Sequence, residues 1–216
     1  MRILELNFER TWRGGERQTL YNMLGFRNAG VSVSLLCRKG YPLEAKAKNE
    51  DFEVFSFNNI FAAFFFMIFK GCRFNIFHAQ SSHILTWCLF SKPFHRAKII
   101  LSRRVDFVPK GMMTKLKYRL TDKIVAVSDA VKNIVESFSG REAVTISDIA
   151  LPMQINKERA RDFLKMQKID ATKHVIGTAA AFVPHKDPLN MVEAVKLLAQ
   201  KRSDFVFLST TFVFNF

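Results

Sequence analysis

Several polar and glycine-containing stretches of this 216-residue sequence have the residue types that bind charged or hydroxylated ligands. The first is Gly14-Gly15-Glu16, which separates a short apolar run, residues 1–7, from a helical pattern over residues 18–28. Two glycines permit positive φ and let another molecule approach the backbone closely. The free N–H groups of a helix start also favour an anion. Taken alone, the pair is explained more simply by a tight turn.

A second group of polar side chains, His78, Ser81, Ser82 and His83, lies at the end of the apolar run at residues 74–79. If this run is a buried strand, these side chains lie where the strand opens into a loop. Imidazole and hydroxyl groups at such a place can hydrogen-bond the hydroxyls of a sugar. A capped helix preceded by a hydrogen-bonded structural histidine explains the same residues equally well.

A third group consists of Arg103, Arg104 and Asp106, which follow another apolar run. Arginine binds phosphate and carboxylate groups in a bidentate manner, so the pair suits a phosphorylated or acidic ligand. The alternative is a surface salt bridge, which contributes little to stability. We favour the binding interpretation.

Alternating strand-like and helix-like runs must position these candidates. Apolar and β-branched runs predict strands at residues 1–7, 31–36, 52–57, 74–79, 99–101, 124–127 and 144–146. Helical patterns cover most of the connections, at residues 18–28, 60–69, 82–90, 110–120 and 129–138. This alternation predicts an α/β fold, a Rossmann-like doubly wound parallel sheet with helices on both faces. Ligands of such sheets bind at the carboxyl ends of the strands, where all three groups fall.

The pattern changes near Leu151-Pro152. A charged helix is expected at residues 157–168, a strand at 175–180, a helix starting at Asp187-Pro188 and a strand at 205–208. Proline at the first helical position is a common helix start. We therefore expect one domain over residues 1–152 and the beginning of a second α/β domain over residues 153–216.

The composition restricts the class of partner. The formal net charge is +14, which attracts polyanions such as nucleic acid, anionic lipid or phosphorylated small molecules. Nucleic acid is the alternative partner that we do not favour, because the basic residues are scattered and no nucleic-acid motif is present. Cys37, Cys72 and Cys88 have no metal-ligand spacing and fit a reducing compartment, so neither a disulfide framework nor a metal site is expected.

Two helical segments bear on membrane binding. Residues 60–69, IFAAFFFMIF, are too short to span a bilayer. We expect them to form a buried core helix, with an interfacial helix as the alternative. The segment 110–120 mixes Lys110, Lys115, Lys117 and Arg119 with Met112, Met113, Leu116 and Leu120. That mixture is typical of peripheral contact with an anionic bilayer. The expected location is cytoplasmic, peripheral on the inner face of the plasma membrane.

In this order, the pieces resemble the GT-B glycosyltransferases, in particular the retaining group known as group 1 or family 4. The resemblance extends over about residues 2–208. It rests on the Gly14-Gly15-Glu16 loop and on four further segments, which are His78-Ala79-Gln80-Ser81-Ser82, KIILSRRVDF (98–107), DKIVAVSDAVKNIV (122–135) and VPHKDPLNMVEAVKLL (183–198).

The resemblance implies two doubly wound domains facing a cleft, with the acceptor on the N-terminal domain and a nucleotide sugar on the C-terminal domain. It implies cell-envelope polysaccharide, lipopolysaccharide or lipid-linked sugar as product, and no metal or other cofactor. The acceptor would contact Gly14, Gly15, His78, Ser81, Arg103, Arg104 and Asp106. Many members have a histidine near Arg104, and this sequence has none there.

The donor side departs from the pattern of the group. Lys186 matches a lysine that neutralises the donor diphosphate, but Ala181 stands where the group has its arginine. His185 can partly replace that charge. The Glu-x7-Glu segment that holds the donor in the group has no counterpart before Phe216. We therefore expect a truncated, inactive chain that binds UDP- and GDP-sugars no more tightly than about millimolar. The sequence does not identify the donor sugar, the acceptor or the linkage.

Overall fold

The chain divides into two compact units, Met1–Leu151 and Pro152–Phe216. The structure is a computed structural model that describes residues 1–150, 155–170, 172–179 and 186–210. Each unit is described by itself.

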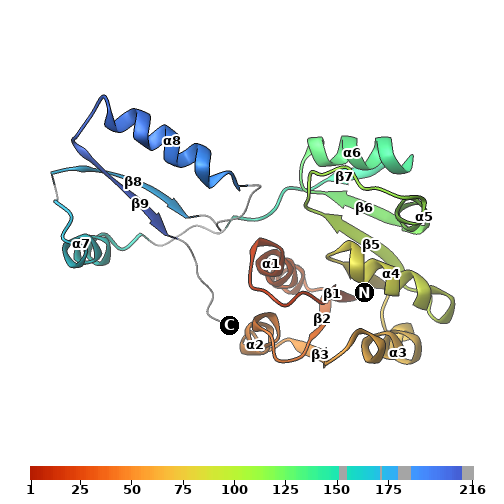
Figure 1. Cartoon of the computed structure of the whole chain (residues 1–216). Coiled ribbons are helices and arrows are strands. Elements are labelled where there is room, and N and C mark those ends of the chain that lie inside the picture. The colour runs from red at the N-terminus through yellow and green to blue at the C-terminus, as the bar shows by residue number, and fades with distance from the viewer. Residues whose placement is uncertain (151–154, 171, 180–185, 211–216) are drawn as a thin grey trace. The chain divides into compact units, whose positions relative to one another are not determined.

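The first unit is built on a parallel sheet of seven strands (Figure 1). The strands are β1 (Arg2–Asn7), β2 (Ser32–Arg38), β3 (Glu53–Phe57), β4 (Ile76–Ala79), β5 (Lys98–Arg103), β6 (Lys123–Ala126) and β7 (Ala143–Thr145). Their order is β3-β2-β1-β4-β5-β6-β7, so the direction of winding reverses between β1 and β4. This is a doubly wound, Rossmann-like sheet, and the predicted fold class is confirmed. A ligand is expected at the carboxyl edge near this reversal.

Helices pack on both faces of the sheet, as Figure 1 shows. They are α1 (Gly14–Asn28), α2 (Pro42–Asn49), α3 (Ile60–Lys70), α4 (Ser82–Ser91), α5 (Met112–Leu120) and α6 (Asp129–Ser139), with the 3-10 turns η1 (Gly71–Arg73) and η2 (Lys92–Phe94). Successive strand side chains point to opposite faces, which produces two cores. Ile3 and Leu35 pack against α1 and α2, whereas Leu4 and Phe77 pack against α3 to α6.

Helix α3 differs from the expected buried core helix. Ala63 and Met67 are buried, but Phe61, Phe65 and Phe69 are 61%, 54% and 70% exposed. The sequence of α3 is apolar around its whole circumference, and the sheet covers one side of it. The other side is therefore an exposed row of phenylalanines.

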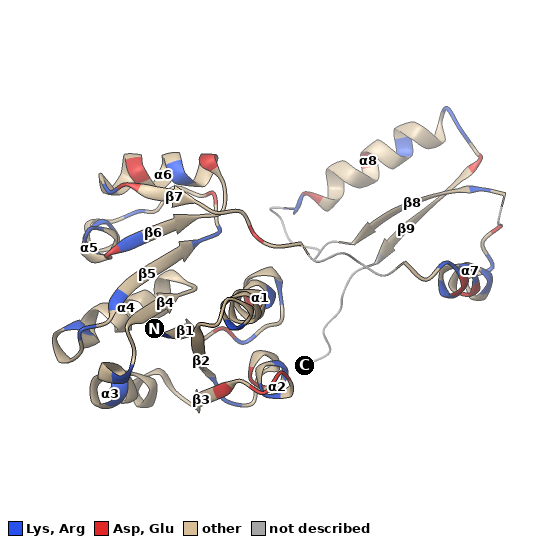
Figure 2. Cartoon of the chain, turned by 180° about the vertical axis from the view of Figure 1, so that it is seen from behind, with Lys and Arg blue, Asp and Glu red and all other residues tan. Residues whose placement is uncertain are grey.

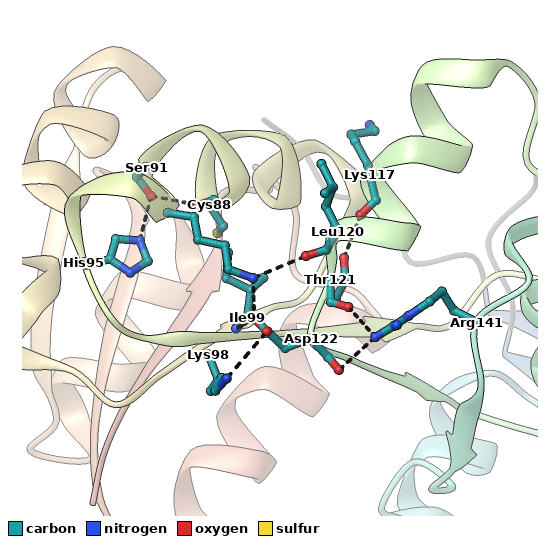
Figure 3. A network of polar contacts seen from close by, with 11 residues as sticks. Cys88, Ser91, His95, Lys98, Ile99, Lys117, Leu120, Thr121, Asp122 and Arg141 are labelled. Carbon is teal, nitrogen blue, oxygen red and sulfur yellow. Dashed lines mark hydrogen bonds and ion pairs between the residues drawn. The ribbon is translucent and has the colours of Figure 1, made fainter.

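Polar contacts join the end of α5 to β5 and β6 (Figure 3). Asp122 precedes β6, and its carboxylate accepts hydrogen bonds from the Ile99 amide and the Lys92 ammonium, both at 2.8 Å. Burial alone raises the pKa of Asp122, but these hydrogen bonds outweigh burial and the net shift is downward. Arg141 donates to the carbonyls of Thr121 and Asp122 at 3.2 and 3.4 Å. The turn between α5 and β6 is thus fixed by charged side chains.

The described part of the second unit contains a two-stranded parallel sheet and two α-helices. Its elements are α7 (Lys157–Met166), β8 (His174–Ala179), α8 (Pro188–Ala199) and β9 (Phe205–Thr210), and Ile176 pairs with Phe207. The predicted helix start is confirmed, because Asp187 caps α8 by accepting the Asn190 amide at 3.2 Å and Pro188 is the first helical residue. None of the residues of this unit whose burial the structure describes is buried.

Candidate functional site

The loop between β1 and α1 is held in place by hydrogen bonds from its own polar residues. Asn7 donates to the Thr19 hydroxyl at 2.9 Å, and Thr19 donates to the Gly15 carbonyl at 2.9 Å. The Glu16 carboxylate accepts the Arg13 amide at 2.7 Å. Because β1 ends at the reversal point of the sheet, these bonds fix the start of α1 at the edge where a ligand is expected.

Gly14 and Gly15 are the first two residues of α1 and not a separate turn. Neither is among the residues with positive φ, so the pair does not use the left-handed conformation that glycine permits. A Cβ added at either position meets nothing within 4 Å. Neither backbone conformation nor packing within the described part of the chain therefore requires glycine here, and open space lies beside both residues.

We expect the substitution Gly15→Ala to raise the free energy of unfolding by about 0.4–1 kcal/mol, because alanine restricts the unfolded chain and fits the helix. Denaturant unfolding checks this. Gly71→Ala is the matched control, since its Cβ would lie 3.0 Å from His95 Cδ2 and 3.1 Å from Phe77 Cζ. That variant should be destabilised. A loss of stability in Gly15→Ala comparable to that of the control would show that the fold itself needs the glycine.

His78 lies inside a buried chain of hydrogen bonds that crosses three strands. Its Nδ1 is 2.7 Å from Glu5 Oε1, and its Nε2 is 2.8 Å from the Ser102 hydroxyl. Glu5 is fully buried, and its second oxygen accepts the Gln80 side-chain amide at 2.6 Å. Both ring nitrogens of His78 are therefore engaged within the protein.

This chain of side chains borders a cavity of about 380 Å³ on the sheet face that also carries α1. The wall is mainly apolar and comes from strands β1, β4, β5 and β6, with Phe26 of α1 on one side. Arg104 and Asp148 lie at the rim of the cavity. Arg104 Nε is 2.9 Å from Asp148, and Arg104 Nη1 donates to Gln80 at 2.6 Å. Arg104 is thus tied to the segment that follows β7.

The order hydroxyl, imidazole, carboxylate is the one that activates a serine nucleophile. Such a nucleophile also needs N–H groups that stabilise the developing oxyanion. Ser102 lies inside β5, which is paired with β4 and β6, so its backbone groups belong to the sheet. We assign the Glu5–His78–Ser102 chain to structural support of the sheet centre.

The three residues of the Arg103 group do not meet. Arg103 is 6% exposed and points to the opposite face from Arg104, where it donates to the Tyr118 hydroxyl at 2.6 Å and to the Phe107 carbonyl at 2.5 Å. Asp106 is exposed, and its carboxylate forms no ion pair in the described part of the chain. Arg103 and Arg104 are adjacent in the sequence but lie on opposite faces of the sheet, because successive side chains along a strand alternate.

A second cavity, of about 360 Å³, lies at the carboxyl edge. Four elements enclose it, namely the loop after β1, the end of β2, the start of α3 and the first two turns of α4. Its lining residues are Phe8, Glu9, Arg10, Thr11, Arg38, Ile60, His83, Ile84 and Trp87. It combines two arginines, a carboxylate, an imidazole and aromatic surface, which are groups that bind hydroxylated and anionic ligands.

Arg38 is the most distinctive residue of this edge cavity. Its guanidinium lies 4.7 Å from the centre of the Phe8 ring and 6.0 Å from that of Tyr41. Arg38 Nε is buried and has no hydrogen-bond partner in the described part of the chain. Sequence analysis named neither Arg10 nor Arg38, because their segments come together only in the folded sheet. His83 was the one signal that pointed to this cavity.

Ser81 is the N-cap residue of α4 at the same edge. Its backbone has the extended conformation of a helix N-cap, but its hydroxyl does not cap the helix. The oxygen is buried and has no hydrogen-bond partner among the described residues. Polar atoms in such a state are uncommon in native proteins, so this hydroxyl is a candidate for contact with a ligand.

In the second unit, Lys186 directly precedes the cap of α8 and is exposed. A lysine beside free helix N–H groups provides positive charge for an anion. His185, predicted to assist it, and Ala181 lie outside the described residues. The described residues contain no cluster of three His, Cys, Asp or Glu side chains that would hold a metal ion.

The strand order of the first unit and the strand–helix–strand arrangement of the second define the fold. The chain has the GT-B fold, in which a doubly wound domain is followed by a second α/β unit. No family model and no curated protein sequence matches the chain, so the likeness is one of structure.

Solved structures of this fold resemble the chain over nearly its whole length. A glycosyltransferase from Rickettsia africae is 20% identical with a TM-score of 0.80, over 97% of this chain and 60% of that protein. Anabaena Alr3699/HepE in complex with UDP-glucose is 13% identical with a TM-score of 0.78, over 99% and 62%.

A putative UDP-N-acetylglucosamine 2-epimerase from Listeria monocytogenes is 10% identical with a TM-score of 0.62, over 96% and 61%. This chain thus spans about 60% of the length of the proteins it matches. The fold is shared by transferases and by an epimerase.

Proposed function

We propose that the chain belongs to a retaining, nucleotide-sugar-dependent glycosyltransferase of family 4 that acts on cell-envelope polysaccharide or a lipid-linked sugar. The observation that carries the proposal is the GT-B fold over 97% of the chain, with a glycosyltransferase at a TM-score of 0.80. A second protein of this fold, Alr3699/HepE, has been seen with UDP-glucose. A lipid-linked acceptor places the protein peripherally at the inner face of the plasma membrane.

The first unit is the acceptor side in this proposal. Acceptor hydroxyls bind at the carboxyl edge, where Gly14 and Gly15 leave open space and the Ser81 hydroxyl has no hydrogen-bond partner among the described residues. Arg38 and Arg10 of the edge cavity bind a negatively charged group on the acceptor. His78, Arg103 and Arg104 support this edge through the contacts described above.

The second unit begins the donor side. When a nucleotide sugar transfers its glycosyl group, negative charge grows on the departing diphosphate and has to be stabilised. Lys186 and the first N–H groups of α8 supply positive charge at one point. In the proposal this electrostatic stabilisation takes the place of a metal ion, and His185 adds charge when it is protonated.

The test is an NMR titration of the whole chain with UDP and with GDP at millimolar concentrations. We expect weak, saturable binding, and we expect Lys186→Ala to weaken it by about tenfold, which is ~1.4 kcal/mol. Lys201→Ala is the matched control, because it removes the same charge beyond the opposite end of α8. Equal binding by both variants would remove Lys186 from the donor site.

A second assay, in which the whole chain is incubated with a nucleotide sugar and an acceptor, separates transfer from epimerisation. A transferase releases free nucleotide when donor and acceptor are supplied together, whereas an epimerase leaves the nucleotide attached to an altered sugar. UDP-N-acetylglucosamine converted without release of UDP would overturn the proposal.

A further inference from the structure

Helix α3 presents an aromatic row to solvent. Phe61, Phe65 and Phe69 are spaced by four residues, which places them on one stripe of the helix, and each is more than half exposed. Ala63 and Met67, on the other side, are buried against the sheet. An apolar stripe of this kind on a protein surface marks a site of interaction.

Neighbouring rings extend this row into a continuous patch. Phe61 lies 5.3 Å from Trp87 of α4, and Trp87 lies 6.4 Å from Phe90, measured between ring centres. The rings of Phe65 and Phe69 stack at 6.3 Å. Phe90 and Phe94 are 59% and 58% exposed. We call these exposed or half-buried rings the α3–α4 patch, which comprises Phe61, Phe65, Phe69, Trp87, Phe90 and Phe94.

The charged residues within α3, α4 and their connections are all basic. Between Glu53 and Asp106 the sequence contains no acidic residue, and Figure 2 shows only blue on α3, α4 and their connections. Lys70 follows Phe69 at the end of α3, and Arg96 follows Phe94. Both are exposed and neither forms an ion pair in the described part of the chain. Apolar rings edged by free cations are complementary to an anionic lipid surface.

We propose that the α3–α4 patch is the surface by which this protein binds an anionic membrane. Its phenylalanines enter the boundary between headgroups and acyl chains while Lys70 and Arg96 contact the headgroups. Trp87 belongs both to the patch and to the lining of the edge cavity. The bound membrane therefore lies beside that cavity, which suits an acceptor anchored in lipid.

This surface differs from the helix that the sequence favoured. Met112, Met113 and Leu116 of α5 are also exposed. However, Lys117 of α5 is turned to Thr86, 3.1 Å away, and Arg119 donates to the Ser139 carbonyl at 3.0 Å. These two cations are engaged by the protein, so α5 offers less free charge than its sequence indicates.

The experiment is co-sedimentation of the whole chain with vesicles of phosphatidylglycerol and phosphatidylcholine, and with phosphatidylcholine alone. The chain should bind the anionic vesicles and release them at high salt. The triple variant Phe61→Ser, Phe65→Ser, Phe69→Ser should bind roughly tenfold or more weakly, because membrane affinity scales with buried apolar area. All three side chains are exposed, so the fold should remain intact, and circular dichroism checks this.

The matched control is the triple variant Met112→Ser, Met113→Ser, Leu116→Ser, which removes three exposed apolar side chains of α5. It should bind like the unmodified chain. The proposal is overturned if the phenylalanine variant binds normally, if only the α5 variant loses binding, or if the unmodified chain binds no anionic vesicle. If gel filtration shows that the unmodified chain is a dimer and the phenylalanine variant is a monomer, the patch binds a second copy of this chain instead of a membrane.

The inference names a surface for the peripheral location included in the proposed function. Vesicle binding requires neither donor nor acceptor, so it succeeds or fails independently of sugar transfer. A chain that binds vesicles through the patch but never binds a nucleotide would retain this inference and lose the proposed function.

Discussion

The substitution Glu5→Ala should lower the free energy of unfolding of the first unit by about 3–5 kcal/mol, the cost of removing one member of a buried pair. Glu5 is fully buried in the centre of the sheet and accepts hydrogen bonds from both His78 and Gln80. Removal of its carboxylate leaves two buried polar groups without a partner. For a unit of this size the midpoint of thermal unfolding should fall by roughly 10 °C.

Tryptophan fluorescence measures this unit specifically, because both tryptophans, Trp12 and Trp87, lie in it. Glu50→Ala is the matched control, since Glu50 forms an exposed ion pair with Arg27, and such pairs contribute about 0–1 kcal/mol. Glu5→Gln should lie between the two, because an amide retains one acceptor. Equal stability of Glu5→Ala and Glu50→Ala would mean that the buried network contributes nothing to the fold.

A second large effect should come from His95 as the pH falls. The His95 ring is 7% exposed and packs on Phe77, with ring centres 4.2 Å apart. Ser91 donates its single hydrogen to the Cys88 carbonyl, so the Ser91 oxygen, 3.0 Å from His95 Nε2, accepts from that nitrogen (Figure 3). Nδ1 is then the unprotonated nitrogen, and it is buried without a partner among the described residues.

Protonation of this ring places a positive charge in a buried position near the positive charge of Lys92. Burial, with a smaller effect from the positive charge of Lys92, lowers the pKa of His95 from 6.5 to about 4. The unfolded chain therefore binds a proton between pH 6.5 and 4 that the folded chain does not. Stability is fully present above pH 6.5 and declines as the pH falls toward 4, with a total loss of about 2–3 kcal/mol.

Denaturant unfolding followed by tryptophan fluorescence at several pH values between 7 and 4 measures this loss. Acidic residues also titrate in this range, so the comparison is with His95→Gln, whose amide donates to Ser91 but does not titrate. The difference in stability between the two proteins should shrink or reverse as the pH falls. Parallel curves would show that His95 does not bind the additional proton.

The sheet could be predicted from the sequence because each strand is a short apolar run with a recognisable end. Helix α2 was not predicted, since PLEAKAKN is short and polar, and its core contact reduces to Leu43 and Ala47. Its one clear signal was Pro42 at the first helical position. The alternation of strands and helices therefore indicates the fold class even though one helix was not predicted.

The candidate site was less predictable, because its contacts join distant segments. Glu5 and His78 are 73 residues apart and meet only through the pairing of β1 with β4. Arg103 and Arg104 are adjacent in sequence, yet they face opposite sides of β5. The exposed face of α3 likewise could not be predicted from composition, since nothing in an apolar helix indicates which side lacks a neighbour.

The contact between Gln18 and Ile149 joins the end of the first unit to α1. The Gln18 amide donates to the Ile149 carbonyl at 2.5 Å and accepts the Ile149 N–H at 2.9 Å. These two hydrogen bonds fasten the segment after β7 to α1, one turn from Gly14 and Gly15. The position of Ile149 is therefore coupled to that of the first turn of α1. A ligand that shifts the start of α1 would shift Ile149 as well.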